Sequence, residues 1–131
     1  MEKPDVLLRE VGGEHYKSSY QPIELMEHVR MCAACSFILK YVYRHKNKGG
    51  KDDLQKALHC CELLEQLGNN WYIGTARNYD EIDMSVRDFH RFIQSNEQLD
   101  DNQTRAILAI CDKDMESLKK AIHAELSNCY S

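Results

Sequence analysis

Residues 33–67 read AACSFILKYVYRHKNKGGKDDLQKALHCCELLEQL, and this stretch decides the fold. On both sides of the Gly49-Gly50 pair, apolar residues recur three or four positions apart, which is the spacing of one face of an α-helix. The pattern predicts one helix over about 33–44 and a second over about 52–67, joined as an αα-hairpin. The expected buried stripes are Ala34, Phe37, Ile38, Tyr41 and Val42 in the first helix, and Leu54, Ala57, Leu58, Cys61, Leu64 and Leu67 in the second.

Helical periodicity continues on both sides of this hairpin. Before it, Pro22 suits the first turn of a helix over about 22–30. The expected buried residues of this helix are Ile23, Met26 and Val29. After the hairpin, the apolar spacing predicts helices over about 82–94, 104–111 and 115–127. No segment alternates apolar and polar residues as a strand would, so we expect an all-α fold, a small helical bundle built around the αα-hairpin with additional C-terminal helices.

The charge of the chain is divided unevenly. Between residues 40 and 56, six Lys or Arg stand against two Asp, whereas between residues 78 and 116, four Lys or Arg stand against ten acidic residues. The net charge is −4, and a local basic site on an acidic protein suits a compact anionic ligand better than a nucleic acid. In a chain of 131 residues, we expect a basic segment, 1–72, and an acidic segment, 73–131, packed as one domain.

The composition also bears on location and partners. No window reaches the roughly 20 apolar residues of a membrane span, so we expect no membrane partner. The first residues lack the layout of a secretion signal, which predicts a cytoplasmic location. A small helical protein can complete its core or its pocket in a symmetric oligomer, and we expect a homo-oligomer with Trp71-Tyr72-Ile73 as a candidate contact.

The turn between the hairpin helices carries the residues with the clearest chemistry. Lys40 and Arg44 lie one helical turn apart, and Lys56 lies one turn into the next helix, so antiparallel packing would bring them together. Arg offers a planar fork to two phosphate oxygens, and Lys offers a mobile charge. A solvated basic turn without a ligand is the alternative. The Gly49-Gly50-Lys51 run is not a P-loop, because His45 stands where that motif has its first Gly and no strand precedes it.

A series of short elements in the first half of the chain resembles a known family. In order, the elements are His15-Tyr16, Pro22-Ile23-Glu24, Lys40-Tyr41 followed by Arg44, then Lys48, and Asp53-Leu54-x-Lys56-Ala57. Their order and spacing over about residues 13–65 resemble the small phage-borne SaV-like family, which includes a podophage nucleotide kinase that lacks a P-loop. Where that family commonly has Gly-Asn before the Lys-Tyr pair, this chain has Ser36 and Phe37.

The resemblance implies a phage or prophage origin and a role with nucleotides. Its matched polar positions, which we expect to bind the ligand, are His15, Tyr16, Lys40, Arg44, Lys48, Asp53 and Lys56. The implied activity is that of a nucleotide kinase acting on nucleoside monophosphates in the host cytoplasm, with no catalytic residue assigned. In an enzyme of this kind Mg²⁺ is the cofactor to expect, and Glu24 and Glu27 share a helix face that could hold it. The alternative is a non-catalytic phage protein that sequesters a nucleotide signal to counter host defence.

The six cysteines give a weaker signal. Cys32-x-x-Cys35, with His28 one turn earlier, has the spacing of metal ligands, but no second local pair completes a zinc site. A thioredoxin-like use of this pair lacks its βαβ context. We therefore expect this pair and Cys60-Cys61 to be reduced thiols in the core, and we assign no metal site.

Overall fold

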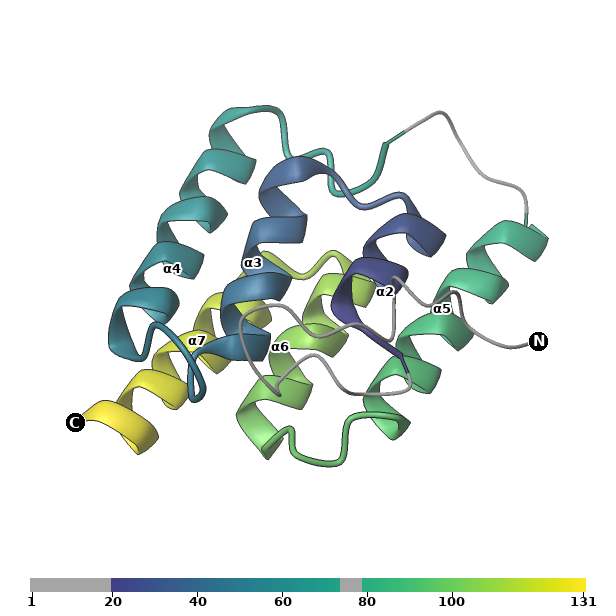
Figure 1. The fold of residues 1–131 in the computed structure, drawn as a ribbon. Coiled ribbons are helices and arrows are strands. Elements are labelled where there is room, and N and C mark those ends of the chain that lie inside the picture. The colour runs from purple at the N-terminus through teal and green to yellow at the C-terminus, as the bar shows by residue number, and fades with distance from the viewer. Residues whose placement is uncertain (1–19, 74–78) are drawn as a thin grey trace.

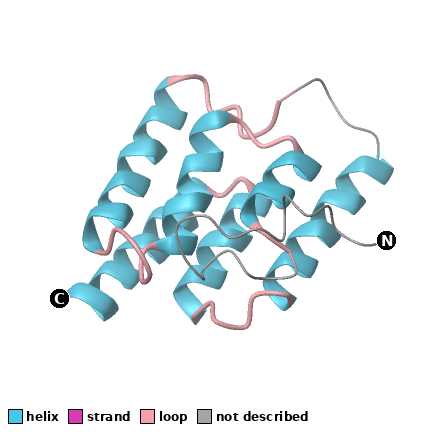
Figure 2. Cartoon of the chain, viewed as in Figure 1, coloured by secondary structure: helices cyan, strands magenta, loops and turns pink. Residues whose placement is uncertain are grey.

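The computed structural model describes residues 20–73 and 79–131, without the side chains of residues 79–84. Helices joined by short connections make up the described chain (Figures 1 and 2). They are α2 (Pro22–Val29), α3 (Ala33–Arg44), α4 (Lys51–Gln66), α5 (Tyr79–Gln94), α6 (Asp101–Asp112) and α7 (Met115–Tyr130). Since these two stretches contain no strand beyond an isolated bridge between Met31 and Tyr72, the predicted all-α fold is confirmed. No described helix is long and apolar enough to span a membrane.

The helices form two layers (Figure 1). In one layer α4, α3, α2 and α5 lie side by side, and α6 and α7 cross behind α3 and α4. Within the hairpin α3 packs along α4, and each of these helices also touches the second layer, because α3 contacts α6 and α4 contacts α7. The C-terminal helices therefore support the hairpin from behind.

The hairpin helices lie where the sequence predicts them, and the glycine turn explains their boundary. Gly50 is the residue before α4, and its φ of 60° lies in the left-handed region that favours glycine. Asp52 and Asp53 follow in the first turn of α4, where negative charge is favoured by the positive end of the helix dipole. Local sequence is therefore enough to place this turn.

The last two helices are longer than their apolar spacing predicts. Helix α6 begins at Asp101 because Asp100 and Gln103 cap it reciprocally: Asp100 Oδ1 accepts the Gln103 N–H at 2.8 Å, and Gln103 Oε1 accepts the Asp100 N–H at 2.9 Å. Helix α7 continues to Tyr130, whose hydroxyl bonds His45 on the α3–α4 turn. A polar cap and a long-range contact therefore extend helices that the apolar pattern alone would end earlier.

One hydrophobic core spans the two layers, and each of the six described helices contributes to it. Its largest fully buried side chains are Tyr20, Leu25, Ile38, Leu39, Leu54, Leu64, Phe89, Phe92, Ile107, Ile110, Leu118 and Ile122. The basic and acidic segments predicted from the sequence thus share this core.

Two predicted buried stripes are rotated in the structure. In α2 the side chain of Leu25 is buried, whereas Ile23 is 55% exposed. In α3 the predicted core residue Phe37 is 47% exposed, while Leu39 and Tyr43 are buried. Helix α3 packs against α4 on one side and α6 on another, so its buried arc is turned away from Phe37. This rotation leaves an aromatic ring on the surface beside the basic residues of the hairpin.

Trp71 is also placed differently from its prediction. It is 3% exposed, and its carbonyl oxygen accepts the backbone N–H of Cys32 at 2.9 Å. Ile73, two residues later, is 63% exposed and donates its backbone N–H to the Arg30 carbonyl at 2.7 Å. The indole of Trp71 is therefore enclosed within one chain, and the prediction that the Trp71-Tyr72-Ile73 segment forms a subunit contact stays a prediction that now depends on the exposed Ile73.

Candidate functional site

The outward side of α3 carries two aromatic rings one helical turn apart. Phe37 and Tyr41 stack with ring centroids 6.4 Å apart and an interplanar angle of 24°. Because Cys35, Ile38 and Val42 occupy the buried side of α3, Phe37 lies on the exposed side, whereas Tyr41 lies at the edge of the buried arc and packs partly against the core. Tyr41 is half-buried and Phe37 is exposed, so together they offer an apolar platform at the protein surface.

Three cations surround the ring of Tyr41. The distances from its centroid are 5.5 Å to Lys40 Nζ, 5.2 Å to Arg44 Cζ and 5.8 Å to Lys56 Nζ. Lys40 also lies 5.7 Å from the centroid of Phe37. Two of these cations come from α3 and one from α4, so the packing of the hairpin creates the cluster. We call Phe37, Lys40, Tyr41, Arg44 and Lys56 the basic-aromatic surface.

Asp53 fixes the position of Arg44 within this surface. Arg44 Nε donates to Asp53 Oδ2 at 3.1 Å, and Arg44 Nη2 donates to Oδ1 at 3.3 Å. The Asp53 carboxylate is 1% exposed and also accepts the Gly49 N–H at 3.0 Å. A Cβ atom at Gly49 would overlap this carboxylate, so glycine is needed there for space. Asp53 therefore binds the protein's own cation and turn.

A second polar network holds the same turn from the C-terminal side. His45 is fully buried; its Nδ1 lies 2.7 Å from the Tyr130 hydroxyl and its Nε2 lies 2.7 Å from Glu125 Oε2. Lys46 forms an ion pair with Asp100 at 2.6 Å. The sequence predicted none of these contacts, because each joins residues more than fifty positions apart. The network attaches the basic turn to α6 and α7.

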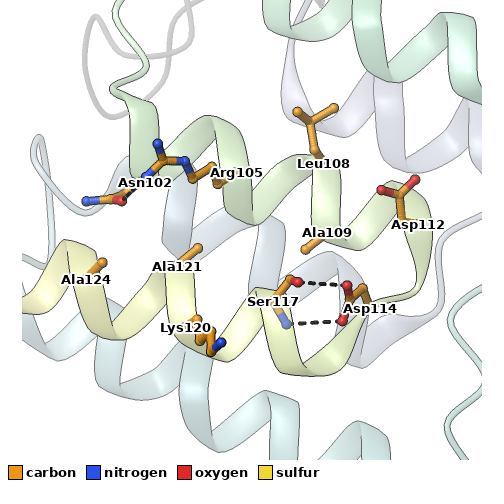
Figure 3. Close-up of a pocket in the computed structure, with 10 residues that line it drawn as sticks. All are labelled: Asn102, Arg105, Leu108, Ala109, Asp112, Asp114, Ser117, Lys120, Ala121 and Ala124. Carbon is orange, nitrogen blue, oxygen red and sulfur yellow. Dashed lines mark hydrogen bonds between the residues drawn. The ribbon is translucent and has the colours of Figure 1, made fainter.

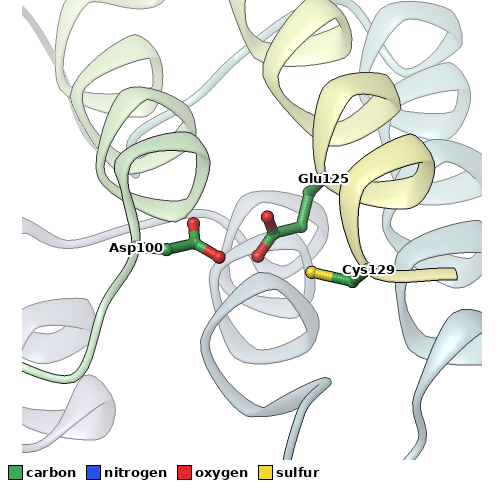
Figure 4. A group of neighbouring side chains, drawn as sticks. All are labelled: Asp100, Glu125 and Cys129. Carbon is green, nitrogen blue, oxygen red and sulfur yellow. The ribbon is translucent and has the colours of Figure 1, made fainter.

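Two carboxyl groups meet inside this network (Figure 4). Burial, followed by hydrogen bonding to Asp100, raises the pKa of Glu125 to about 7. Burial also lowers the pKa of His45, which keeps the imidazole neutral. Asp100, Glu125 and Cys129 have ligand atoms within 4.8 Å of one another, which is close enough for a metal ion. Lys46 already neutralises Asp100, and the raised pKa of Glu125 lets a proton neutralise the second carboxyl group, so we assign the network a structural role.

The structure brings together some of the predicted site residues and not others. Lys40, Arg44 and Lys56 converge on Tyr41, and Asp53 joins them through Arg44. Lys48 is exposed in the turn, and no described contact links it to the Tyr41 ring. The predicted residues His15 and Tyr16 lie outside the described residues.

Sequence reasoning missed the aromatic part of this surface. Phe37 and Tyr41 have helical spacing, and that spacing led to their assignment to the core. The signal that separates them from core residues is their alternation with Lys40 and Arg44 on one helix face. In a helix, an apolar residue with cations three or four positions away on the same face is expected at the surface rather than in the core.

The predicted Mg²⁺ pair also has a structural explanation. Glu24 Oε1 accepts the backbone N–H of Gln21 at 2.9 Å, which caps the start of α2. Glu27 is exposed on the same helix. The Glu24 carboxylate thus has a local role that needs no ion.

A separate pocket of about 440 Å³ lies between α6 and α7 (Figure 3). Ala109 and Ala121 leave space between the helices, and Arg105, Asp112 and Lys120 contribute charges of both signs. Asp114 accepts two hydrogen bonds from Ser117, which cap the start of α7. None of the lining residues belongs to α3 or α4, so this pocket is distinct from the basic-aromatic surface.

Comparison with known protein families gives a match over part of the chain. A family model described as a protein of unknown function, DUF3310, matches residues 10–62. No curated protein and no solved structure matches the chain. The matched residues include α2, α3 and most of α4, and therefore the whole basic-aromatic surface, but they end before the helices that support it. The chain is thus similar to this family over its N-terminal segment.

Proposed function

We propose that this protein binds a nucleotide or a phosphorylated nucleotide derivative on the basic-aromatic surface. The observation that carries the proposal is the gathering of Lys40, Arg44 and Lys56 around the ring of Tyr41. Asp53 balances one of these three charges through its ion pair with Arg44. An excess of positive charge therefore remains beside a surface that can accept an anion.

Electrostatics favour a phosphate in this position. The three cations around the half-buried ring repel one another. A multivalent anion bound between them attracts all three and so offsets this repulsion. Arg44 is held by Asp53, so its orientation is set before a ligand arrives, whereas the lysines can adjust to the anion. A phosphate bound here gains charge-assisted hydrogen bonds worth about 1.5–3 kcal/mol each.

The aromatic platform supplies the second half of a nucleotide site. Phe37 is 47% exposed and lies against Tyr41 on one side, which leaves ring surface for a planar base. Stacking of a base on an aromatic side chain contributes about 1–3 kcal/mol. A ring beside phosphate-binding cations suits a nucleotide better than inorganic phosphate, because both parts of the ligand are then used.

Two uses of the same site follow. In a kinase resembling the phage enzyme that lacks a P-loop, the cations would neutralise negative charge on the phosphoryl group during its transfer to a nucleoside monophosphate. In a sequestering protein that counters host defence, the same cations would simply hold a nucleotide signal. Asp53 favours the second use, because this carboxylate is already committed to Arg44 and Gly49 and is not open to a metal ion or an acceptor hydroxyl.

One experiment tests the proposal and separates its two uses. The full chain is titrated by calorimetry with a panel of nucleoside mono-, di- and triphosphates and cyclic nucleotides. It is then incubated with each nucleoside monophosphate together with a nucleoside triphosphate as phosphoryl donor, with and without Mg²⁺, and the recovered ligands are analysed by chromatography. Binding with an unchanged ligand supports sequestration, and a phosphorylated product supports the kinase. If no member of the panel binds, or if Lys40→Ala and Lys56→Ala bind as well as the unaltered chain, the basic hairpin is a solvated turn and the proposal fails.

A further inference from the structure

The start of α3 holds a pair of cysteines in an arrangement that the proposed nucleotide site does not use. Cys32 is the residue that caps α3, and its Sγ accepts the backbone N–H of Cys35 at 3.4 Å. Cys32 is half-buried, whereas Cys35 is 0% exposed. Cys32 is therefore partly open to solvent at the end of the helix, and Cys35, one helical turn along, is closed off from solvent.

This placement differs from the prediction made from the sequence. Cys35, Cys60 and Cys61 are core thiols, as predicted, but Cys32 is not. The backbone N–H of Cys32 donates to the Trp71 carbonyl at 2.9 Å, which holds the residue at the junction of α2, α3 and the 71–73 segment. Residues outside α3 therefore fix the capping position of Cys32, so the arrangement needs no βαβ unit.

Within the described part of the chain, the pair does not belong to a group with metal-ligand geometry. His28, the third residue with ligand spacing, has its Nδ1 within 2.7 Å of the Tyr20 hydroxyl. Among the described residues, the group with metal-ligand geometry is Asp100, Glu125 and Cys129, which includes neither Cys32 nor Cys35. The chemistry open to Cys32 and Cys35 is therefore that of two neighbouring thiols.

The pKa of Cys32 is lowered, whereas the pKa of each of the other five cysteines is raised. All six cysteines lie in the described residues. A hydrogen bond from the Cys35 thiol, with further bonds from backbone N–H groups, outweighs burial and lowers the pKa of Cys32 to about 6. Its hydrogen bond to Cys32, together with burial, raises the pKa of Cys35. Burial raises the pKa of the remaining four thiols: Cys60, Cys61, Cys111 and Cys129. A thiolate, rather than a thiol, is the nucleophile in disulfide exchange.

We propose that Cys32 and Cys35 form a thiol–disulfide exchange site, in which Cys32 attacks a low-molecular-weight disulfide and Cys35 resolves the mixed disulfide. A small disulfide suits the site because Cys32 is only partly open to solvent. The spacing suits the second step because Cys35 lies one turn behind the attacking sulfur.

The exchange takes two steps. The Cys32 thiolate forms a bond to one sulfur of the small disulfide, and the other half of that molecule leaves as a thiolate. Cys35 transfers its proton to this thiolate and attacks the Cys32 sulfur, which releases the second half as a thiolate. Two protein sulfurs are oxidised to one disulfide, and one small disulfide is reduced to one thiol and one thiolate.

To test this proposal, the reduced full chain is treated with oxidised glutathione in the absence of oxygen, and the products are followed by mass spectrometry. The unaltered protein should lose two hydrogens and show a Cys32–Cys35 disulfide in its peptide map. Cys35→Ser should instead keep a glutathione adduct on Cys32, because its resolving thiol is absent. Cys32→Ser should form neither product, and serine is a favourable helix cap, so this variant should remain folded.

Cys129→Ser is the matched control, because Cys129 is exposed but has a raised pKa. It should react as the unaltered protein does. With the unaltered chain at pH 7, iodoacetamide should alkylate Cys32 at least about tenfold faster than Cys129, because far more of Cys32 is thiolate. Similar alkylation rates at the two positions, an adduct on Cys129 rather than Cys32, or equal oxidation of Cys32→Ser would overturn the proposal.

Discussion

Arg44 and His45 are neighbours in the chain, but they are held by different helices, α4 and α7. Arg44 turns towards α4 and pairs with Asp53, nine residues away, beside a surface open to ligand. His45 turns towards α7 and contacts Glu125 and Tyr130, which are 80 and 85 residues away, inside the protein. The first interaction orients a cation for binding, and the second attaches the turn to the C-terminal layer.

One short turn is therefore held by two separate sets of contacts. The local contact decides where a binding charge points, whereas the distant contact decides how firmly the turn is held. Variants on the Arg44 side should therefore change ligand affinity or the stability of the hairpin. Variants on the His45 side should change stability and its dependence on pH, with the binding residues left in place.

The largest expected effect is on the Arg44 side and concerns folding. Asp53→Ala removes a carboxylate that is 1% exposed, which leaves Arg44 and the Gly49 N–H without this partner. Breaking a buried ion pair from one side costs roughly 3 kcal/mol or more. Urea unfolding followed by circular dichroism should show the loss. Asp52→Ala, one position earlier on the exposed side of α4, is the control, and equal losses in both variants would contradict the structural role of Asp53.

The same ion pair changes how Arg44 should be tested as a binding residue. Arg44→Ala removes a phosphate contact, but it also leaves Asp53 buried without its partner, so loss of binding could reflect loss of structure. Lys40 and Lys56 have no comparable buried partner among the described ion pairs. These lysines therefore give the cleaner measurement of the binding surface.

The second prediction concerns affinity. Lys56→Ala should weaken binding of a responsive nucleotide by about 1.5–3 kcal/mol, or roughly ten- to a hundredfold, because it removes one charge-assisted phosphate contact. Its unfolding free energy should change little, since the side chain is exposed. Calorimetry at fixed salt measures the first effect. Lys120→Ala removes the same charge from an exposed position on α7, and equal affinity losses in the two variants would show that only overall charge matters.

The third prediction concerns pH and lies on the His45 side. The pKa of Glu125 is raised from 4.5 to about 7, so between these values the folded state holds more protons than the unfolded state. The unfolding free energy contributed by this group should therefore fall as pH rises through that window. The side chain of Glu125→Gln stays neutral at every pH and keeps an N–H donor for Asp100. The unfolding free energy of this variant minus that of the unaltered chain should therefore rise by about 1–3 kcal/mol between pH 4.5 and pH 8.

His45 supplies an internal check on this measurement. Burial lowers its pKa, so the unfolded state takes up the proton first and stability should fall as pH drops below 6.5. That loss should persist in Glu125→Gln, although the two effects oppose each other between pH 4.5 and 6.5 in the unaltered chain. Denaturant titrations across the pH range test both slopes. An unchanged difference between variant and unaltered chain from pH 4.5 to 8 would mean that Glu125 has the same pKa in the folded and unfolded states, which would contradict the prediction.

The contrast between local and distant contacts also explains what the sequence could predict. The hairpin depends on helical spacing of apolar residues, on a glycine turn and on cations placed one helical turn from each end of that turn. All of these are local patterns. The all-α fold and the convergence of Lys40, Arg44 and Lys56 could be derived from them. The start of α6 was predicted about three residues too late, because that prediction used the apolar spacing and not the cap formed by Asp100 and Gln103.

The remaining features depend on packing between segments far apart in the chain. The burial of Trp71 and the exposure of Phe37 depend on which helices cover α3, and periodicity fixes the spacing of a stripe but not its neighbours. The contact between His45 and Glu125 joins two ionisable residues across 80 positions, and neither residue stands in a recognisable motif. Such contacts follow from the whole fold, so no local pattern predicts them.

The smallest expected effect concerns Phe37, and it distinguishes a platform from a core residue. Because this ring is 47% exposed, Phe37→Ala should lower the unfolding free energy by less than about 1 kcal/mol, far below the roughly 3–5 kcal/mol for a buried phenylalanine. Nucleotide affinity should fall by about 1 kcal/mol, because one stacking surface is lost while the cations remain. Phe92→Ala, at a fully buried ring of α5, should show the large folding loss. If Phe37→Ala lowers stability as much as Phe92→Ala and leaves affinity unchanged, the ring packs as part of the fold and the phosphate contacts alone bind the ligand.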